Sequence, residues 1–357
     1  MMLAAPHREK VPVAVRSLAC LFPARSVSNS EPPYTQIPDV PHDWWQFWGV
    51  QRRGMFDAAA GETHDRLAVR ACREALRIAE LEAADIDLVL ANTSNLVVST
   101  STGPRFFPRL APVIREELRA RSAVAMDVEQ ECLSFLIHLQ NAVNLIRMGR
   151  CKRVLVCSVE HITDLLDYTD KSATIFGDAA AAAVVTADSD GASLLGSSYV
   201  SRPEHYDLAT LRWRNPRYKP KNELVPDDFH TYFDLREDAA DGMRKFVPVF
   251  VPEMVKQALE RARLRADDVD YFVFHQPSPI LIRGWANALG VARNRYCTTL
   301  ETRGSLVSAS MPITLHHAIE QGHVGPGKTI VIAGASTGWG FGAQVWRWGE
   351  TRINALG

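Results

Sequence analysis

Cys132 is the residue of this sequence best placed for covalent chemistry. It follows a short strand-like segment and a polar turn, in Met126-Asp-Val-Glu-Gln-Glu-Cys132, and precedes an apolar helix that runs to Gly149. The N–H groups and dipole of a helix N-terminus stabilise a thiolate and lower the pKa of the thiol. The position therefore suits a nucleophile for acyl transfer, although a cysteine beside Leu and Phe is also a common packing residue.

His275 is the second candidate. It ends the apolar segment Tyr271–Phe274, which we expect to be a strand, and a Pro-containing turn follows it. Ligands of α/β proteins collect beyond the carboxyl ends of strands, where a histidine can take up or donate a proton. The alternative is a structural histidine that caps the strand.

A glycine-rich stretch is the third candidate. Four glycines lie among the nine residues 334–342, directly after a predicted buried strand. Glycines let the backbone approach a ligand and offer N–H donors to an oxyanion, with Gly338 the best-placed donor. The P-loop pattern is absent, so a nucleotide phosphate site of that kind is excluded. A tight turn between two strands is the other interpretation.

The elements that must position these residues are repeated along the chain. Residues Ala75–Asp87 and Ala258–Asp270 align without a gap, with seven identities in thirteen positions. A second pair of segments, Leu145–Cys157 and Ala318–Ala333, shares the order helix, glycine, basic residue and buried strand. Helix–strand units in tandem predict mixed or parallel sheets covered by helices. We therefore expect an α/β fold of two similar halves.

Composition narrows the class of protein. The 357 residues carry 40 basic and 41 acidic side chains, a net charge of −1, which gives no general attraction to nucleic acid or to an anionic membrane. The longest apolar run, Ala179–Val185, is far shorter than the roughly 20 residues of a membrane span. The six cysteines form no CxxC pair, which favours free thiols in the cytoplasm.

Neither a metal nor another cofactor is expected. The neighbouring histidines His316, His317 and His323 are interpreted as a helix surface and its turn, and no acidic cluster accompanies them at ligand spacing. Residues 201–241 break the helix–strand rhythm and predict an irregular surface excursion that caps a site. The basic run Arg212–Lys221 within it is either a solvated loop or a contact for a phosphate-bearing substrate or carrier.

Four motifs together resemble the thiolase superfamily and, within it, the β-ketoacyl-acyl-carrier-protein synthase III branch. They are Asp127–Phe135 around the cysteine, His275-Gln276, Phe176–Ala180 and the loop Gly334–Gly342. The resemblance implies a duplicated fold in αβαβα layers. Its N-terminal half, residues 1–187, would carry the nucleophile Cys132, and its C-terminal half, residues 188–357, would carry the catalytic His275 and the glycine-rich loop.

One position departs from that branch. Ser305, in Gly304–Pro312, stands where the branch carries an Asn that helps His275 to hold the enolate formed from malonyl thioester. Serine has a shorter reach and a different donor geometry. The resemblance thus implies a supporting role for Ser305 and puts ordinary malonyl-dependent chain initiation in doubt.

A narrower resemblance is to the catalytic subunits of bacterial 2-alkyl-4-quinolone synthases, carried by the aromatic-rich Asp43–Asp57, by Tyr271–Pro277 and by residues 338–346. It implies a medium-chain acyl group on Cys132, delivered by coenzyme A or a carrier protein. It also implies a 2-aminobenzoylacetate-like acceptor and a sister condensing-enzyme-like subunit in a heterodimer. The candidate substrate-binding residues, which core packing explains equally well, are Trp45, Phe47, Trp48, Arg53 and Trp339.

Three hypotheses follow. The first is an acyltransferase that makes alkylquinolones with Cys132 and His275. The second is a synthase III-like enzyme that uses another acceptor, or an ordinary 3-oxoacyl-carrier-protein synthase III. The third is a non-catalytic partner subunit, against which the intact cysteine and histidine argue.

Overall fold

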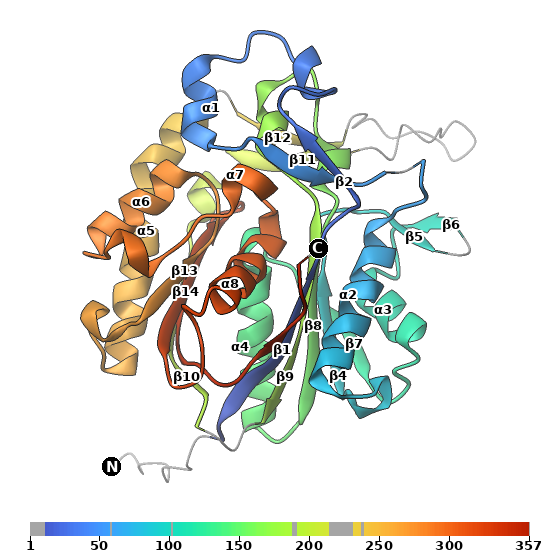
Figure 1. Ribbon diagram of the computed structural model, residues 1–357, viewed down its shortest axis with the longest axis vertical. Helices are drawn as coiled ribbons and strands as arrows, with labels where there is room; N and C mark the ends of the chain where they lie inside the picture. Colours follow the sequence, from blue (N-terminus) through green and yellow to red (C-terminus); the bar gives the residue numbers. More distant parts are fainter. Residues whose placement is uncertain are drawn as a thin grey trace.

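The computed structural model describes residues 11–57, 59–100, 103–187, 191–213, 231–236 and 239–356. Two mixed β-sheets form the framework (Figure 1). The six-stranded sheet has the order β16 (Arg352–Ile353), β1 (Val13–Leu21), β9 (Ala179–Ala187), β8 (Arg153–Glu160), β4 (Leu88–Asn92) and β7 (Val124–Asp127). The four-stranded sheet has the order β10 (Ser193–Ser201), β15 (Gly340–Arg347), β14 (Thr329–Ser336) and β13 (Tyr271–Phe274).

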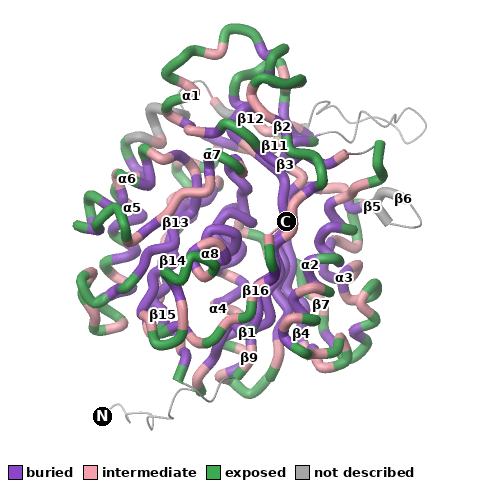
Figure 2. The backbone as a smooth tube through the Cα atoms, viewed as in Figure 1, coloured by how far each residue is buried: buried purple, intermediate pink, exposed green. Residues whose placement is uncertain are grey.

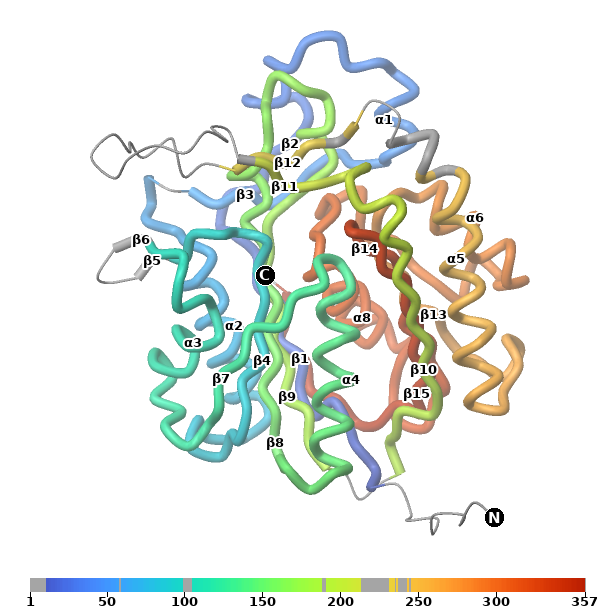
Figure 3. Tube along the Cα trace, turned by 180° about the vertical axis from the view of Figure 1, so that it is seen from behind, coloured from blue at the N-terminus to red at the C-terminus, as the bar shows by residue number. Residues whose placement is uncertain are grey.

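Helices separate and cover the two sheets. Helices α4 (Ser134–Arg147) and α8 (Ser310–Glu320) lie between them (Figure 3). The outer face of the larger sheet is covered by α2 (His64–Ala79) and α3 (Leu110–Leu118). The outer face of the smaller sheet is covered by α5 (Ala239–Ala262) and α6 (Pro279–Ala288). The predicted αβαβα layering is confirmed.

The two halves repeat the same strand pairing. Strand β1 is antiparallel to β9, β9 is antiparallel to β8, and β8 is parallel to β4. In the same way β10 is antiparallel to β15, β15 is antiparallel to β14, and β14 is parallel to β13. The duplication expected from the sequence echoes is thus visible in topology. The division at residue 187 stays a prediction, and the late strand β16 pairs with β1 of the first half.

Burial on both faces explains the apolar sequences of the central strands. Every residue of Ala179–Val185 is buried, because α2 covers one face of β9 while α4 and α8 approach the other. Figure 2 shows buried residues along the strands of both sheets and exposed ones on the outer helix surfaces. None of the helices in the described part of the chain has the length and apolar character of a membrane span.

Shorter elements lie beyond the ends of the sheets (Figure 1). They include the helices α1 (His42–Trp48) and α7 (Leu300–Arg303), and the strand pairs β2 (Arg25–Ser28) with β3 (Arg52–Met55), β5 (Val98–Thr100) with β6 (Gly103–Arg105), and β11 (Ala209–Trp213) with β12 (Thr231–Leu235).

The prediction of an irregular excursion over residues 201–241 was wrong for residues 209–213 and 231–235, which form β11 and β12, and for residues 239–241, which begin α5. Strands β11 and β12 pair in an antiparallel ladder that runs from Ala209 opposite Leu235 to Trp213 opposite Thr231. Residues 214–221 of the basic run lie outside the described residues. The side chain of Arg212, which is described, pairs with Asp234 at 2.5 Å.

The segment Phe176-Gly-Asp178, just before β9, contacts three other loops. The buried carboxylate of Asp178 accepts hydrogen bonds from the N–H of Phe56 at 3.0 Å and from the N–H and hydroxyl of Thr163 at 3.0 and 2.5 Å. A side chain on Gly177 would overlap the carbonyl oxygen of Arg303. Packing of this segment therefore requires Asp178 as a hydrogen-bond acceptor and Gly177 as a residue without a side chain.

Asp178→Ala should lower the free energy of unfolding by at least about 3 kcal/mol, because two backbone N–H groups and one hydroxyl lose their acceptor, at about 1–3 kcal/mol for each buried group left unpaired. Urea denaturation measures the loss. The exposed Asp164 supplies the control, since its replacement by Ala should change stability by no more than about 0.5 kcal/mol. A loss below about 1 kcal/mol for Asp178→Ala would contradict this account.

Candidate active site

Cys132 lies where two elements meet between the sheets. It is the middle residue of the 3-10 turn η3 (Glu131–Leu133), which leads directly into the central helix α4. The turn contacts strand β14 and a second 3-10 turn, η11 (Val307–Ala309), which both belong to the other half of the chain. The cysteine therefore sits at the junction of the halves.

The thiol is buried, and burial governs its acidity. Desolvation raises the pKa of Cys132 well above its usual value, and the nearby Glu131 and Glu160 raise it further. The backbone N–H groups of Thr337 and Cys132 act in the opposite direction and lower the pKa of the thiol. The expectation that the helix N-terminus lowers the thiol pKa was wrong, because desolvation outweighs the helix. The resting group is a thiol that needs a base.

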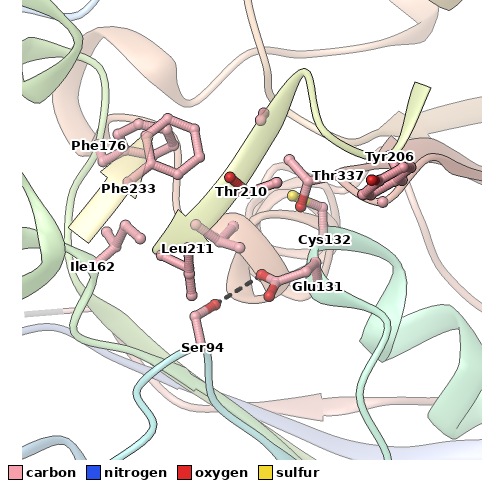
Figure 4. Close-up of a pocket in the computed structure, with 13 residues that line it drawn as sticks. Ser94, Glu131, Cys132, Ile162, Phe176, Tyr206, Thr210, Leu211, Phe233 and Thr337 are labelled. Atoms are coloured by element: carbon pink, nitrogen blue, oxygen red, sulfur yellow. Dashed lines mark hydrogen bonds between the residues drawn. The ribbon is translucent and has the colours of Figure 1, made fainter. Parts of the chain in front are cut away.

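A cavity of about 240 Å³ opens above the sulfur (Figure 4). Both halves of the chain and the β11–β12 pair contribute to its walls, which are mostly apolar. The lining residues are Ser94, Glu131, Cys132, Ile162, Phe176, Tyr206, Ala209, Thr210, Leu211, Phe233, Val307, Thr337 and Gly338. Such a space suits an apolar chain whose reactive carbon lies at the sulfur.

The glycine-rich stretch serves as a tight turn and as a wall of this cavity. Residues 337–339 connect β14 to β15, and Gly338 has a φ of +81°, in the left-handed region that favours glycine. Both Thr337 and Gly338 line the cavity. The tight-turn interpretation is confirmed, and the role of Gly338 as a donor to an oxyanion stays a prediction.

His275 is held just beyond β13, as its position in the sequence predicted. Its N–H donates to the carbonyl oxygen of Ala333 at 2.9 Å, and a side chain on Gly334 would collide with its Cβ. Burial lowers the pKa of His275 to about 3, so the imidazole is neutral at pH 7. Its Nδ1 has no hydrogen-bond partner among the described residues.

The structure does not join the two predicted catalytic side chains directly. Within the described ranges no hydrogen bond links Cys132 and His275, and His275 is not among the residues that line the cavity. Their elements do converge, since η3 contacts β14 and β14 is the neighbour of β13. Ser305 is buried beside η11, and its backbone pairs with Ile175 and Gly177.

The predicted substrate-binding residues lie outside the lining of this cavity. Trp45, Phe47 and Trp48 lie on helix α1, which packs against α6. Trp339 packs edge-on against Phe246, with 5.1 Å between the ring centres. Their role in binding stays a prediction.

Arg53 is fully buried. Its guanidinium donates to Asn29 Oδ1 at 2.6 Å and to the carbonyl oxygen of Thr174 at 2.5 Å, and it lies 4.0 Å from the centre of the Tyr34 ring. These contacts make it an anchor between loops, and its predicted contact with substrate stays untested.

Two residues of the site, Ser94 and Glu160, were missed in the sequence. Ser94 and Glu160 stand at or just beyond the carboxyl ends of β4 and β8, and Glu131 follows β7, the other neighbour of β4. Because these three strands are parallel, their ends meet at one edge of the sheet. Applied to every strand, the rule that located His275 would also have located these polar side chains.

The described residues contain no group of three or more His, Cys, Asp or Glu arranged to hold a metal ion. His316 is fully buried and its Nε2 lies 2.9 Å from the carbonyl oxygen of Asn354. Its assignment to a helix surface was wrong, because α8 lies between the two sheets. His317 is partly exposed and lies 3.8 Å from Glu320.

A buried thiol that lines a mostly apolar cavity is compatible with acyl transfer through a thioester. Sequence comparison supports that class. Residues 126–203 match the family described as 3-oxoacyl-[acyl-carrier-protein (ACP)] synthase III, and residues 259–348 match 3-oxoacyl-[acyl-carrier-protein (ACP)] synthase III C terminal.

Two relatives match over almost the whole chain. The 2-heptyl-4(1H)-quinolone synthase subunit PqsC of Pseudomonas aeruginosa is 40% identical over 349 residues, which are 96% of this chain and 99% of that protein. The β-ketoacyl-[acyl-carrier-protein] synthase III of Roseobacter denitrificans is 33% identical over 334 residues, which are 92% of this chain and 96% of that protein.

Solved structures agree on the fold. The priming β-ketosynthase of the R1128 polyketide pathway superposes with a TM-score of 0.82 and 25% identity, covering 96% of this chain and 98% of that one. The 3-oxoacyl-[acyl-carrier-protein] synthase III of Aquifex aeolicus gives 0.81 and 24%, covering 94% and 100%. The chain is a condensing acyltransferase that belongs to the β-ketoacyl-acyl-carrier-protein synthase III family of the thiolase superfamily, and its resemblance to PqsC is confirmed.

Cys132→Ala should abolish covalent acylation, since no other thiol lines the cavity. Intact-protein mass spectrometry after incubation with octanoyl-coenzyme A should show one octanoyl adduct on the unmodified chain and none on the variant. Cys151→Ala is the matched control, because this half-buried thiol lies beyond the far end of α4. An adduct that persists in Cys132→Ala would assign the nucleophile elsewhere.

Proposed function

We propose that the chain transfers a medium-chain acyl group from coenzyme A or a carrier protein to Cys132 and condenses it with 2-aminobenzoylacetate. Carbon dioxide and water leave, and a 2-alkyl-4-quinolone forms. The observation that carries the proposal is the 40% identity, over 96% of the chain, to a 2-heptyl-4(1H)-quinolone synthase subunit. The mostly apolar cavity above the buried thiol is consistent with an alkyl chain.

In the first step His275 takes the proton of the Cys132 thiol. The raised pKa of the thiol requires a base. The neutral imidazole of His275 has a free lone pair, but its lowered pKa makes it a weak base, so we propose that it takes the proton as the sulfur bonds to the thioester carbon. The thiolate attacks the thioester carbonyl, and the N–H groups of Thr337, Gly338 and Cys132 stabilise the oxyanion. The donor thiol leaves with a proton, and the acyl group remains on Cys132.

In the second step the acceptor loses carbon dioxide, and its enolate carbon attacks the acyl carbonyl, which releases the Cys132 sulfur. The amino group then adds to the new ketone and water leaves as the ring closes. A free β-keto acid loses carbon dioxide more readily than a malonyl thioester does. Ser305 in place of an amide donor fits this lower demand for enolate stabilisation.

A second candidate function is acyl transfer to another acceptor, including malonyl-carrier protein. It is favoured by the 33% identity to a β-ketoacyl-[acyl-carrier-protein] synthase III. A non-catalytic partner subunit is disfavoured, because such a chain has no need of a thiol at the floor of a cavity.

We also propose a cytoplasmic setting, with which the six free cysteines are in keeping.

We also propose that a sister condensing-enzyme-like subunit covers the edge of the larger sheet. Strand β7 ends that sheet, and its Val124 and Met126 are 59% and 47% exposed. Phe107 is 85% exposed. An open edge strand with apolar side chains is a template for pairing with another chain.

Product analysis tests the reaction. With octanoyl-coenzyme A and an equimolar mixture of 2-aminobenzoylacetate and malonyl-carrier protein, the main product should be the heptylquinolone. His275→Ala should slow its formation roughly 10²–10⁴-fold, the usual effect of removing a positioned base. Efficient condensation with malonyl-carrier protein, and none with 2-aminobenzoylacetate, would contradict the proposal and indicate an ordinary 3-oxoacyl-carrier-protein synthase III.

Co-expression with the sister subunit should give an active 1:1 heterodimer, and Val124→Lys should dissociate it, because it places a charge on the paired edge. Light scattering with size-exclusion chromatography measures the assembly. Met148→Lys, an exposed apolar residue after α4, is the control and should leave assembly intact. An isolated chain that forms an active homodimer would contradict the proposed partner.

A further inference from the structure

Glu131 places a carboxylate in the cavity directly beside the nucleophile. It is the first residue of the turn η3, next to Cys132 in the chain, and it lines the cavity together with Ser94. Figure 4 shows the Ser94 hydroxyl and the Glu131 carboxylate facing each other, and the hydroxyl donates to Oε2 at 2.9 Å.

A second carboxyl group behind it is fully engaged. Glu160 is buried, and its Oε2 accepts the N–H of Ser94 at 3.1 Å while its Oε1 accepts the hydroxyl of Ser308. Burial and the nearby charge of Glu131 raise the pKa of Glu160 to about 8. Glu160 is therefore a support of the loops around the cavity, and its oxygens are occupied by the protein.

Glu131 differs because one of its oxygens is left to the cavity. Ser94 is the sole hydrogen-bond partner of its carboxylate among the residues that the structure describes, so Oε1 accepts no hydrogen bond from them. The neighbouring wall is apolar, formed by Ile162, Leu211 and Phe233. The Glu131 side chain is only partly buried, so this oxygen is open to the cavity, and it offers a hydrogen-bond acceptor to a ligand that carries an N–H group.

The backbone conformation of Glu131 is energetically unfavourable. Its φ is +44°, in the left-handed region that residues other than glycine seldom occupy and that costs about 1–3 kcal/mol. Through this turn two consecutive residues, Glu131 and Cys132, both line the cavity. A group bound at Glu131 is thereby placed close to an acyl group on the neighbouring sulfur.

We propose that Glu131 determines acceptor specificity by accepting a hydrogen bond from the amino group of an aminoaryl β-keto acid. The inference rests on the proposed function and names the contact that distinguishes this acceptor from those without an amino group. Glu131 is then a positioning residue, since the bond formed to the acyl carbon involves the enolate carbon and not the nitrogen. Losing a buried partner of a polar ligand group is expected to cost at least tenfold in binding.

The test compares two acceptors on the octanoylated full chain, in the assembly in which it purifies. These are 2-aminobenzoylacetate and benzoylacetate, which lacks the amino group, and the readouts are carbon dioxide release and loss of the octanoyl adduct. The unmodified chain should show at least a tenfold lower KM for the amino acceptor. Glu131→Met should abolish most of that ratio, and Glu131→Gln, which retains an acceptor oxygen, should keep part of it.

Controls separate this contact from general damage. Octanoylation of Cys132 is measured first in each variant by intact-protein mass spectrometry, and the KM ratio is taken on acylated protein. Glu129→Gln changes another carboxyl group, two residues away, whose side chain pairs with Arg109 at 2.9 Å outside the cavity, and it should leave the KM ratio within twofold.

The outcomes are distinguishable. A KM ratio that stays the same in Glu131→Met, or a ratio near one in the unmodified chain, would overturn the role of Glu131 and leave the proposed function standing. Absence of the octanoyl adduct, or of turnover with either acceptor in the unmodified chain, would overturn the proposed function and this inference with it. If Glu131→Met fails to acylate, Glu131→Gln decides by the same ratio.

Discussion

The contact between the Cys132 turn and the end of β14 is the one on which the site depends. The turn belongs to the first half of the chain, and the Thr337 N–H that lowers the pKa of the thiol follows a strand of the second half. The central helix α4, buried between the two sheets, fixes the turn from below. Any relative movement of the halves would therefore separate Cys132 from Thr337 and from one wall of the cavity.

Burial at this junction also determines the protonation states of Cys132 and His275. It raises the pKa of Cys132 and lowers that of His275, so both groups rest uncharged. A neutral pair avoids the cost of two charges inside the protein, and the thiolate forms only when the proton moves. Glu131 and Glu160 also raise the pKa of Cys132, because negative charge on either carboxyl group disfavours the thiolate.

Sequence patterns predicted the framework well, because buried strands and amphipathic helices carry periodic signals. The strand Tyr271–Phe274 has the predicted bounds, and the duplication appears in the strand pairing. The cavity wall was not predictable, since Leu211, Phe233 and Ile162 come from distant segments that meet only in the fold. The direction of the Cys132 pKa shift was also missed, because desolvation depends on burial that a local motif does not report.

The central claim is that an acyl group on Cys132 is the species that condenses. The direct measurement is a single turnover of the octanoylated protein, freed of coenzyme A thioester and mixed with 2-aminobenzoylacetate, followed by intact-protein and small-molecule mass spectrometry. The account predicts loss of the adduct at least as fast as steady-state turnover, with one equivalent of heptylquinolone formed. Loss of the adduct as free octanoic acid alone, with no quinolone, would contradict it.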